Sequence, residues 1–353
     1  MAPSKLQQWF PWAQTPVILN GPMIGAACPS LATEISKAGG VGLLSSVVKV
    51  DKDSPELTKL DGDLAQSRDL LGGDQFLRVG ASFITGDPSI TNWEETALPI
   101  IAKHRPALVW LFAPDGEVKP HGQIIRALRA LGANRPRVFV QVGNVAAARE
   151  AARDGADALV CQGIDAGGHQ FRKGMGVVSI VPEVSRMLDE EDEFKGREIA
   201  VLAAGGIVGG KGVAAALALG ADGVVMGTRF TVADESIFPD FRKEQVLKTT
   251  DGGSCTLKSP FNDRLNNSKL WGPLYDGRSI ISEIHEKFLA GASLEECQAA
   301  VKSVAPPEMG ARLINTWAGT GVGMVNKGGP AGEIVKEIRE ETKATIRKMA
   351  ELV

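Results

Sequence analysis

Short apolar runs recur along the first two thirds of the chain, and Ala-rich stretches with helical spacing separate them. The repeating unit is plainest in three segments, residues 31–46, 145–163 and 212–228. In these segments Gly39, Gly155 and Gly220 fall where the C-terminus of a helix needs a left-handed residue. Each unit therefore predicts a helix followed by a strand.

Eight runs qualify as strands: residues 17–20, 41–45, 77–83, 107–113, 137–142, 157–162, 199–204 and 222–227. They are continuously apolar rather than alternating, which is typical of parallel strands covered by helices on their outer face. Eight strands alternating with helices predict an α/β protein with a (β/α)8 TIM barrel. An open doubly wound sheet is the alternative. The stretch LNGPMIGAACP after the first strand lacks the GxGxxG fingerprint, which disfavours a dinucleotide-binding version of that sheet.

The composition changes after Phe230, where turn residues and charges of both signs replace the repeating unit. Helical patterns resume at residues 280–290, 294–303 and 331–350. We therefore expect residues 1–230 to form the barrel core. Residues 231–353 are expected to form a smaller, mainly helical part packed on the barrel mouth, and a return of the chain to the barrel is left open.

Composition narrows the classes of function. The 353 residues carry a net charge of -3, which argues against nucleic acid and against anionic membrane surfaces as partners. The four cysteines are far apart and form no CxxC pair, so neither a disulfide framework nor a metal site is expected. The N-terminal stretch resembles no signal peptide and no apolar run is long enough to span a membrane, which predicts a cytoplasmic protein.

Glycine-bearing turns follow the last two predicted strands. Gly205 and Gly206 come after the seventh strand, and Gly227 and Thr228 come after the eighth. Barrels commonly bind phosphate at these two places, because backbone N–H groups converge there and glycine allows close approach. The plainer explanation, that the glycines only make tight turns, suffices for either turn alone. The occurrence of both favours a phosphate site.

Several polar or small residues are predicted at the same end of the barrel, where barrel enzymes carry their active sites. They are Pro22, Met23, Gly25, Ser82, Gln141 and Gln162. Glutamine amides both donate and accept hydrogen bonds, which suits the polar edge of a heterocycle. Each position alone is better explained as a turn residue facing solvent, so the prediction depends on their convergence.

His169 follows the sixth predicted strand on a Gly-Gly turn that would present it over the rim. Histidine is the side chain best suited to proton transfer near neutral pH, which makes His169 a candidate base for a carbon acid. The chain's other three histidines, His104, His121 and His285, carry no such positional signal. Asp165 could orient His169 or face solvent, and solvent is the favoured interpretation.

Four segments together resemble the nitronate monooxygenases, the family formerly called 2-nitropropane dioxygenases. They are NGPMIGAACPSLATEISKAGGVGLLSS, CQGIDAGGHQ, VLAAGGIVGGKGVAAALALGADGVVMGTRF and WAGTGVGMVN, within residues 16–325. The resemblance implies an FMN-dependent barrel enzyme that oxidises alkyl nitronates, with nitroalkanes as a second substrate class. O2 is the oxidant, and a carbonyl compound and nitrite are the products.

The resemblance also implies roles for individual residues. His169 would be the catalytic base, and Gly205, Gly206, Gly227 and Thr228 would hold the FMN phosphate. The resemblance also puts along the flavin Pro22, Met23, Ser82, Gln141, Gln162, Gly163, Gly167 and Gly168. Gly25 and Met226, at the ends of the first and last predicted strands, are expected to be cofactor-binding positions as well.

Two departures from the family pattern leave the shape of the substrate open. Some bacterial members use several tyrosines around the substrate, whereas Tyr275 is the only tyrosine here, and Thr320 stands where they carry glutamine. An NAD(P)H-dependent FMN reductase of quinones or enoyl thioesters is the main alternative. A barrel that binds a phosphate ligand without flavin is the other. The oligomeric state, a homodimer included, is left open.

Overall fold

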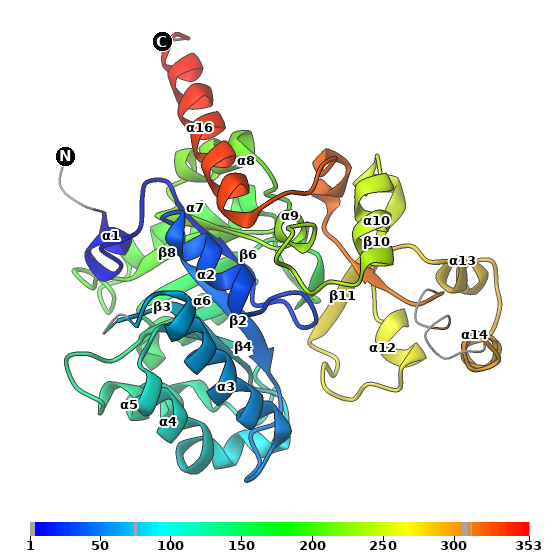
Figure 1. Cartoon of the computed structure of the whole chain (residues 1–353), viewed down its shortest axis with the longest axis horizontal. Helices are drawn as coiled ribbons and strands as arrows, with labels where there is room; N and C mark the ends of the chain where they lie inside the picture. Colours follow the sequence, from blue (N-terminus) through cyan, green and yellow to red (C-terminus); the bar gives the residue numbers. More distant parts are fainter. Residues whose placement is uncertain (1–3, 74–75, 305–309, 311–312, 353) are drawn as a thin grey trace.

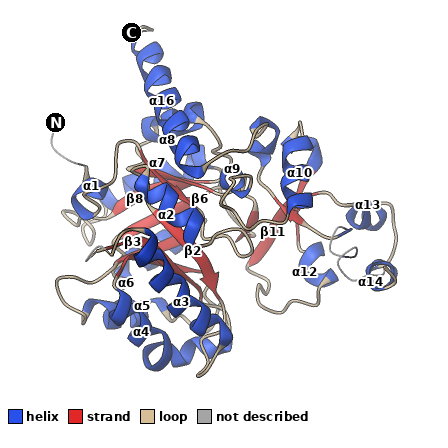
Figure 2. Ribbon diagram, in the orientation of Figure 1, coloured by secondary structure: helices blue, strands red, loops and turns tan. Residues whose placement is uncertain are grey.

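The computed structural model describes residues 4–73, 76–304, 310 and 313–352. It contains a large barrel and a smaller sheet beside it, connected by long loops (Figure 1, Figure 2). The barrel comprises eight parallel strands in the order β1-β9-β8-β6-β5-β4-β3-β2. They are β1 (Val17–Asn20), β2 (Gly42–Val47), β3 (Leu77–Ile84), β4 (Pro106–Phe112), β5 (Arg137–Val142), β6 (Ala158–Gln162), β8 (Ala200–Ala204) and β9 (Gly223–Met226). The predicted TIM barrel is confirmed, and each predicted strand is present to within two residues at either end.

The barrel closes between β1 and β2 through few main-chain contacts. Leu19 and Val41 form the bridge between these strands. The side chain of Asn20, which is fully buried, supplements it by donating to the carbonyl of Leu43 at 2.9 Å and accepting from the Leu43 N–H at 2.8 Å. The amide thus replaces two ladder hydrogen bonds where the regular pairing is short.

Helices cover the outside of the barrel. They are α2 (Pro29–Lys37), α3 (Pro55–Leu70), α4 (Trp93–His104), α5 (His121–Arg129), α6 (Val145–Asp154), α7 (Val177–Glu190) and α8 (Gly210–Ala218), with a short 3-10 helix, η1 (Pro88–Asn92), before α4. Local sequence explains their ends: Asn144 caps α6 by accepting from the Ala147 N–H, and Gly155 ends it with a φ of 101°. Gly155 is thus the left-handed C-terminal residue that the sequence pattern predicts, and asparagine is a residue type favoured at the N-cap.

The barrel interior is packed solid. Strand residues such as Trp110 and Phe139 fill it, and Leu6 and Phe10 from the N-terminal segment around α1 (Lys5–Trp9) close its amino-terminal end. The described residues thus fill the interior and the amino-terminal end, and the carboxyl-terminal rim is where barrels bind their ligands.

The last helix, α16 (Ala331–Ala350), packs against α2 and α8 on the barrel wall. Arg339 donates to the carbonyls of Ala38 and Gly39, and Glu341 accepts from the Gly210 N–H at the start of α8. The helix directly after β9, α9 (Thr228–Thr231), has only four residues. We infer that α16 takes the place of the eighth outer helix, and that the chain between α9 and α16 is an excursion from the barrel.

That excursion contributes a sheet that the sequence did not predict. Antiparallel strands β10 (Thr256–Ser259), β11 (Tyr275–Ile280) and β12 (Thr316–Trp317) pair in that order, and β7 (Gly168–Phe171), from the loop after β6, pairs with β11. His169 therefore lies on a strand, opposite Gly277, and not on the predicted turn. Around the sheet lie α10 (Asp240–Lys248), α11 (Gly252–Cys255), α12 (Phe261–Leu265), α13 (Glu283–Leu289), α14 (Leu294–Lys302) and the 3-10 helix η2 (Thr320–Met324).

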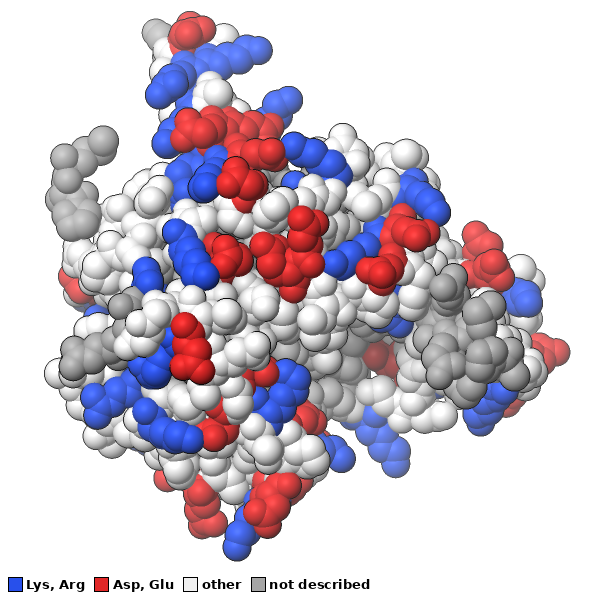
Figure 3. Space-filling view, in the orientation of Figure 1, with Lys and Arg blue, Asp and Glu red and all other residues white. Residues whose placement is uncertain are grey.

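The face shown in Figure 3 mixes basic and acidic side chains over most elements and carries no broad area of one sign. Among the described residues, no helix is both long and apolar enough to cross a bilayer.

Candidate functional site at the barrel rim

Hydroxyl contacts join the ends of three neighbouring strands at the rim. Ser46 on β2 donates its hydroxyl proton to the carbonyl of Pro22, at 3.0 Å, and its oxygen lies 2.8 Å from Ser82 Oγ on β3. Because the Ser46 proton is directed at Pro22, Ser82 is the donor in the second contact. The structure thus brings Pro22 and Ser82 to one side of the rim and adds Ser46, which has no sequence signal of its own.

A row of amide contacts continues around the rim. Trp110 Nε1 donates to Gln141 Oε1 at 3.2 Å, and Gln141 Nε2 donates to Gln162 Oε1 at 2.6 Å. Gln162 Nε2 then donates to the carbonyl of His169 at 3.2 Å. An NH2 group has two protons, so each glutamine keeps one N–H for another acceptor.

The reason for glycine differs between the two turns. Gly205 and Gly206 have φ angles of 104° and 73°, and a Cβ on Gly205 would lie 2.8 Å from the Gly163 carbonyl oxygen. Packing and backbone conformation therefore account for Gly205. Gly227 has a φ of -95°, and a Cβ there would meet only Met23 Sδ, at 3.7 Å. The protein itself gives no steric reason for glycine at this position, so the space beside it is open to a ligand.

Unused hydrogen-bond donors gather at the same turns. Within the described part of the chain, the backbone N–H groups of Gly206, Gly227 and Thr228 have no acceptor. The Thr228 hydroxyl oxygen accepts from the Gly319 N–H at 3.0 Å, which leaves its proton free to donate. Because β8 and β9 are neighbours, these turns lie side by side and present a donor set suited to an anion.

The other residues predicted to contact the flavin differ in whether their side chains can reach a ligand at the rim. Met23 lies near Gly227, but the fully buried Met226 side chain belongs to the core between sheet and helices, so only its main chain can reach a ligand. A Cβ on Gly163 would lie 2.7 Å from Val177, which makes packing sufficient to explain that glycine.

Three more predicted glycines lie in or near the loops that follow β1 and β6, with Gly168 at the start of β7. A Cβ on Gly167 would lie 2.5 Å from the main chain of Ala318, so it too is required by packing. Gly25 and Gly168 have φ angles of 75° and 71° and open space around them, so backbone conformation alone favours glycine at both.

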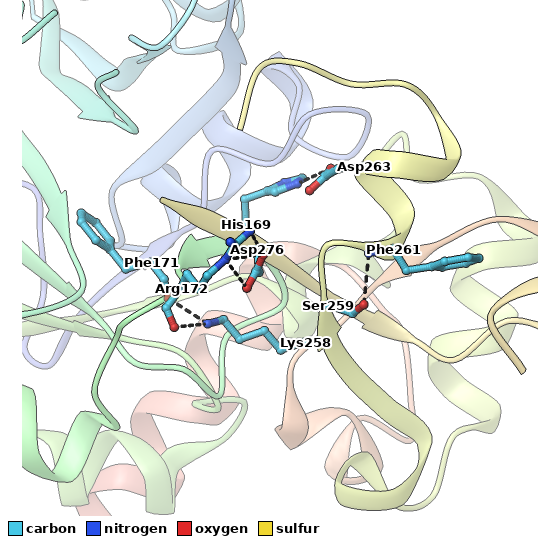
Figure 4. A network of polar contacts seen from close by, with 8 residues as sticks. All are labelled: His169, Phe171, Arg172, Lys258, Ser259, Phe261, Asp263 and Asp276. Atoms are coloured by element: carbon cyan, nitrogen blue, oxygen red, sulfur yellow. Dashed lines mark hydrogen bonds and ion pairs between the residues drawn. The ribbon is translucent and has the colours of Figure 1, made fainter. Parts of the chain in front are cut away.

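His169 is held from several sides. Its Nε2 lies 2.8 Å from Asp263 Oδ1 on α12. Its ring stacks on Trp271, with centroids 3.5 Å apart and planes inclined by 7°, and Trp317 approaches at 4.8 Å. Figure 4 shows the imidazole directed at Asp263. The excursion contributes all three of these partners. Asp263 and Trp271 had no signal in the sequence, and Trp317 opens the segment WAGTGVGMVN without being predicted as a site residue.

Within the described part of the chain, Asp165 makes no hydrogen bond to His169. Its carboxylate accepts from the Thr320 hydroxyl at 3.3 Å, and its carbonyl accepts from the Thr320 N–H at 2.9 Å. Asp165 also lines an open cavity of about 350 Å³ together with Gly205 and Gly206. Asp165 therefore does not orient His169, and its half-buried carboxylate, which we expected to face solvent, contacts Thr320 instead.

A second polar network lies behind the small sheet. Arg172 makes a bidentate ion pair with Asp276, and Lys258 donates to the carbonyls of Phe171 and Arg172 at 2.9 Å (Figure 4). Burial lowers the pKa of Lys258. Since Asp276 is adjacent to Gly277, the partner of His169 in the ladder, its side chain points to the opposite face.

Aromatic rings continue from His169 towards the barrel. Phe112, Phe171 and Trp271 surround Tyr275 with centroid distances from 5.1 to 6.4 Å. The Tyr275 hydroxyl donates to the Pro114 carbonyl at 3.0 Å, and burial raises the pKa of this phenol. Tyr275 therefore stays protonated near neutral pH.

The other three histidines contact side chains other than those that hold His169. His104 Nε2 lies 2.8 Å from Asp61, and His121 Nε2 lies 2.8 Å from Thr85 Oγ1. Burial lowers the pKa of His121 to about 4. His285 stacks on Phe261, and burial lowers its pKa as well. Among the described residues, no group of three or more His, Cys, Asp or Glu is arranged to hold a metal ion.

The barrel and its rim define the class of this protein. A closed barrel of eight parallel strands with its site at the carboxyl-terminal rim is the architecture of many enzymes. A family model described as "Nitronate monooxygenase" matches residues 109–341. The chain belongs to the nitronate monooxygenase family of oxidoreductases, which confirms the resemblance noted in the sequence.

Two curated relatives are similar over almost the whole chain. Nitronate monooxygenase of Neurospora crassa is 45% identical, with the alignment covering 98% of this chain and 94% of that protein. Nitronate monooxygenase npaC of Metarhizium robertsii is 33% identical over 97% and 95% of the two chains.

Solved structures share the fold. FabK from Thermotoga maritima superposes with a TM-score of 0.77 at 24% identity over the whole of both chains. The nitroalkane oxidase from Streptomyces ansochromogenes superposes with a TM-score of 0.70 at 23% identity, covering 95% of this chain and 98% of that one. At these identities the likeness concerns the fold alone.

Membership of the family implies a flavin cofactor. The residues at the rim fit one: free donors at the two glycine turns suit a phosphate, and the spare N–H groups of Gln141 and Gln162 suit the edge of a heterocycle.

Proposed function

We propose that this protein binds FMN at the barrel rim and oxidises alkyl nitronates with O2 to a carbonyl compound and nitrite, with nitroalkanes as a second substrate class. The observation that supports the proposal is the set of contacts around His169, in a chain of the nitronate monooxygenase family: Asp263 and Trp271 hold its ring, and Gln162 at the end of β6 donates to its carbonyl.

The FMN phosphate would be held by Gly205, Gly206, Gly227 and Thr228. Support comes from the unpaired N–H groups at these turns and from the open space beside Gly227. Pro22, Met23, Ser82, Gln141 and Gln162 would lie along the ring system. Bound there, the isoalloxazine would supply the redox chemistry, while the protein positions the substrate and sets the local electrostatics.

His169 would act on the α-proton of the substrate. A neutral nitroalkane is a carbon acid, so its oxidation requires a base, and an imidazole accepts a proton at neutral pH. A nitronate arrives already deprotonated, and His169 would then only orient it.

Aromatic side chains would exclude water from the substrate. Trp271 and Trp317 pack against the His169 ring, and Phe171 packs against Tyr275. Tyr275 cannot exchange a proton with the substrate near neutral pH, because its hydroxyl is engaged with Pro114 and burial raises its pKa. Proton transfer therefore depends on the imidazole.

The proposal is tested by the visible spectrum of the purified protein and by its reductant. We expect flavin absorbance that bleaches when propyl-2-nitronate is added without oxygen and bleaches only slowly with NADH, and nitrite release from the nitronate under air. Rapid bleaching by NADH without nitrite formation from the nitronate would instead identify a reductase. A colourless protein that releases no nitrite after addition of FMN would exclude both.

A further inference from the structure

The contact between His169 and Asp263 joins parts of the chain that lie 94 residues apart. His169 belongs to β7, which leaves the barrel after β6, and Asp263 belongs to α12 in the excursion. Both side chains are largely buried, with 10% and 14% of their surface exposed, and the Nε2 to Oδ1 distance is 2.8 Å. A charge-assisted contact in such a shielded place is stronger than one on the open surface.

Asp263 is held by its neighbours on α12. Phe261 is buried and stacks on His285 with centroids 4.4 Å apart. Asn262 Nδ2 donates to Ser279 Oγ on β11 at 3.0 Å, and the Asp263 carbonyl accepts from the Ser268 N–H at 2.8 Å. Anchored on both sides, the helix presents the carboxylate in a fixed direction.

The imidazole plane is fixed as well. Trp271 lies parallel to the ring at 3.5 Å, and Trp317 packs at an angle of 57°. A side chain at position 277, opposite His169 in the ladder, would overlap Trp317, so Gly277 keeps room for this arrangement. The ring is therefore clamped through its face and through Nε2.

The two ring nitrogens consequently differ. An ionised carboxylate only accepts hydrogen bonds, so a neutral imidazole facing Asp263 carries its proton on Nε2. Nδ1 makes no hydrogen bond within the described residues, and it is absent from the fully buried unpaired atoms. Nδ1 is thus the nitrogen with an available lone pair.

We propose that Asp263 is a positioning residue that keeps the proton of neutral His169 on Nε2, so that Nδ1 is the atom that accepts the substrate α-proton. The bond from carbon to hydrogen breaks, the proton moves to Nδ1, and the electron pair stays on the substrate as the nitronate. Asp263 then balances the charge of the imidazolium. The role of Nδ1 in proton transfer rests on the proposed function, whereas the tautomer set by Asp263 does not.

The test of the tautomer is ¹⁵N NMR of the FMN-loaded protein with labelled histidine. Only four histidines contribute signals, and the His169→Asn variant assigns the one in question. At alkaline pH we expect the wild type to show protonated Nε2 and unprotonated Nδ1. In Asp263→Ala we expect both tautomers to be populated, because the acceptor is gone.

Asp276→Ala is the matched control. It removes a carboxylate from the same small sheet, but from the Arg172 ion pair on the other face, so the His169 signals should keep the wild-type pattern. A wild-type spectrum with the proton on Nδ1, or identical tautomer patterns in the wild type and Asp263→Ala, would overturn the proposal.

A kinetic measurement tests the consequence. Asp263→Ala should lower kcat/KM for a nitroalkane by about 100-fold, because a misoriented base loses most of its effect, and should change kcat/KM for the matching nitronate by less than about threefold. Equal losses with both substrates would remove the link from Asp263 to proton transfer. If the wild type turned over neither substrate, the proposed function would fail, and the NMR pattern would still decide the role of Asp263.

Discussion

His121 offers a direct test of how burial controls a titrating group in this fold. The residue begins α5, its imidazole is buried, and its Nε2 contacts Thr85 Oγ1. Burial lowers its pKa from 6.5 to about 4, because a charged imidazole would lose its hydration. Replacing it with glutamine removes the titration and keeps an amide that can bond to Thr85.

The size and sign of the effect of His121 on stability follow from proton binding in the folded and unfolded states. The unfolded chain takes up the proton near pH 6.5, whereas the folded protein does so near pH 4. Between these values the unfolded state binds more protons, so the free energy of unfolding falls as the pH falls. Each unit of pKa difference corresponds to about 1.4 kcal/mol. His121 should therefore lower the free energy of unfolding of the wild type by about 2.5 kcal/mol when the pH falls from about 7.5 to about 4.5.

Guanidinium unfolding followed by tryptophan fluorescence measures this at both pH values. The difference in unfolding free energy between the wild type and His121→Gln should shift by about 2.5 kcal/mol in favour of the variant at the lower pH. Thr85→Val is the control: it removes the hydrogen bond but leaves the buried imidazole, so it should lower stability at both values and keep the wild-type pH dependence. The same pH dependence in the wild type and His121→Gln would refute the reasoning.

Three substitutions test the rim and the barrel wall. Gly227→Ala should weaken FMN binding at least about tenfold in a fluorescence titration, because the methyl group fills open space beside the proposed phosphate. The melting temperature of the apoprotein should not change, and unchanged FMN binding would count against the site. Gly319→Ala places its Cβ against the Asp165 carbonyl and should lower stability by about 2 kcal/mol, whereas an unchanged melting curve would show that the close packing is not needed. Glu341→Gln weakens the acceptor for the Gly210 N–H, and the free energy of unfolding in urea should fall by about 1 kcal/mol. An unchanged free energy would imply that α16 does not cap α8.

The barrel could be predicted because its signals are local. Each strand is a compact apolar run, and three of the repeating units carry a glycine with positive φ, such as Gly155, after the helix. The rim residues followed from the barrel, since the ends of parallel strands meet at one edge. Ser46 was missed because nothing in its own segment distinguishes it from other serines.

The small sheet could not be predicted in the same way. Its strands are short, and β10 reads TLKS, with no run of apolar residues and no turn signal that specifies a partner. The pairing of β7 with β11 spans about one hundred residues, so the strand that carries His169 looks like part of a turn in the sequence.

The partners of His169 were hidden for the same reason. Asp263 lies in a polar stretch where a carboxylate is unremarkable, and Trp271 follows it in a loop rich in turn residues. Only the tertiary fold brings both to the imidazole. The position of α16 on the barrel wall could not be predicted either, because its helical pattern does not show which surface it covers.

The central claim, that His169 at the rim takes a proton from the substrate, is tested most directly by His169→Asn. Nitrite release should be compared for one nitroalkane and its preformed nitronate, with FMN occupancy matched by absorbance. We expect turnover of the nitroalkane to fall by at least about 100-fold and turnover of the nitronate to stay within about threefold of the wild type, since only the first substrate needs a base. Equal losses on both substrates, or an unaffected nitroalkane rate, would contradict the account.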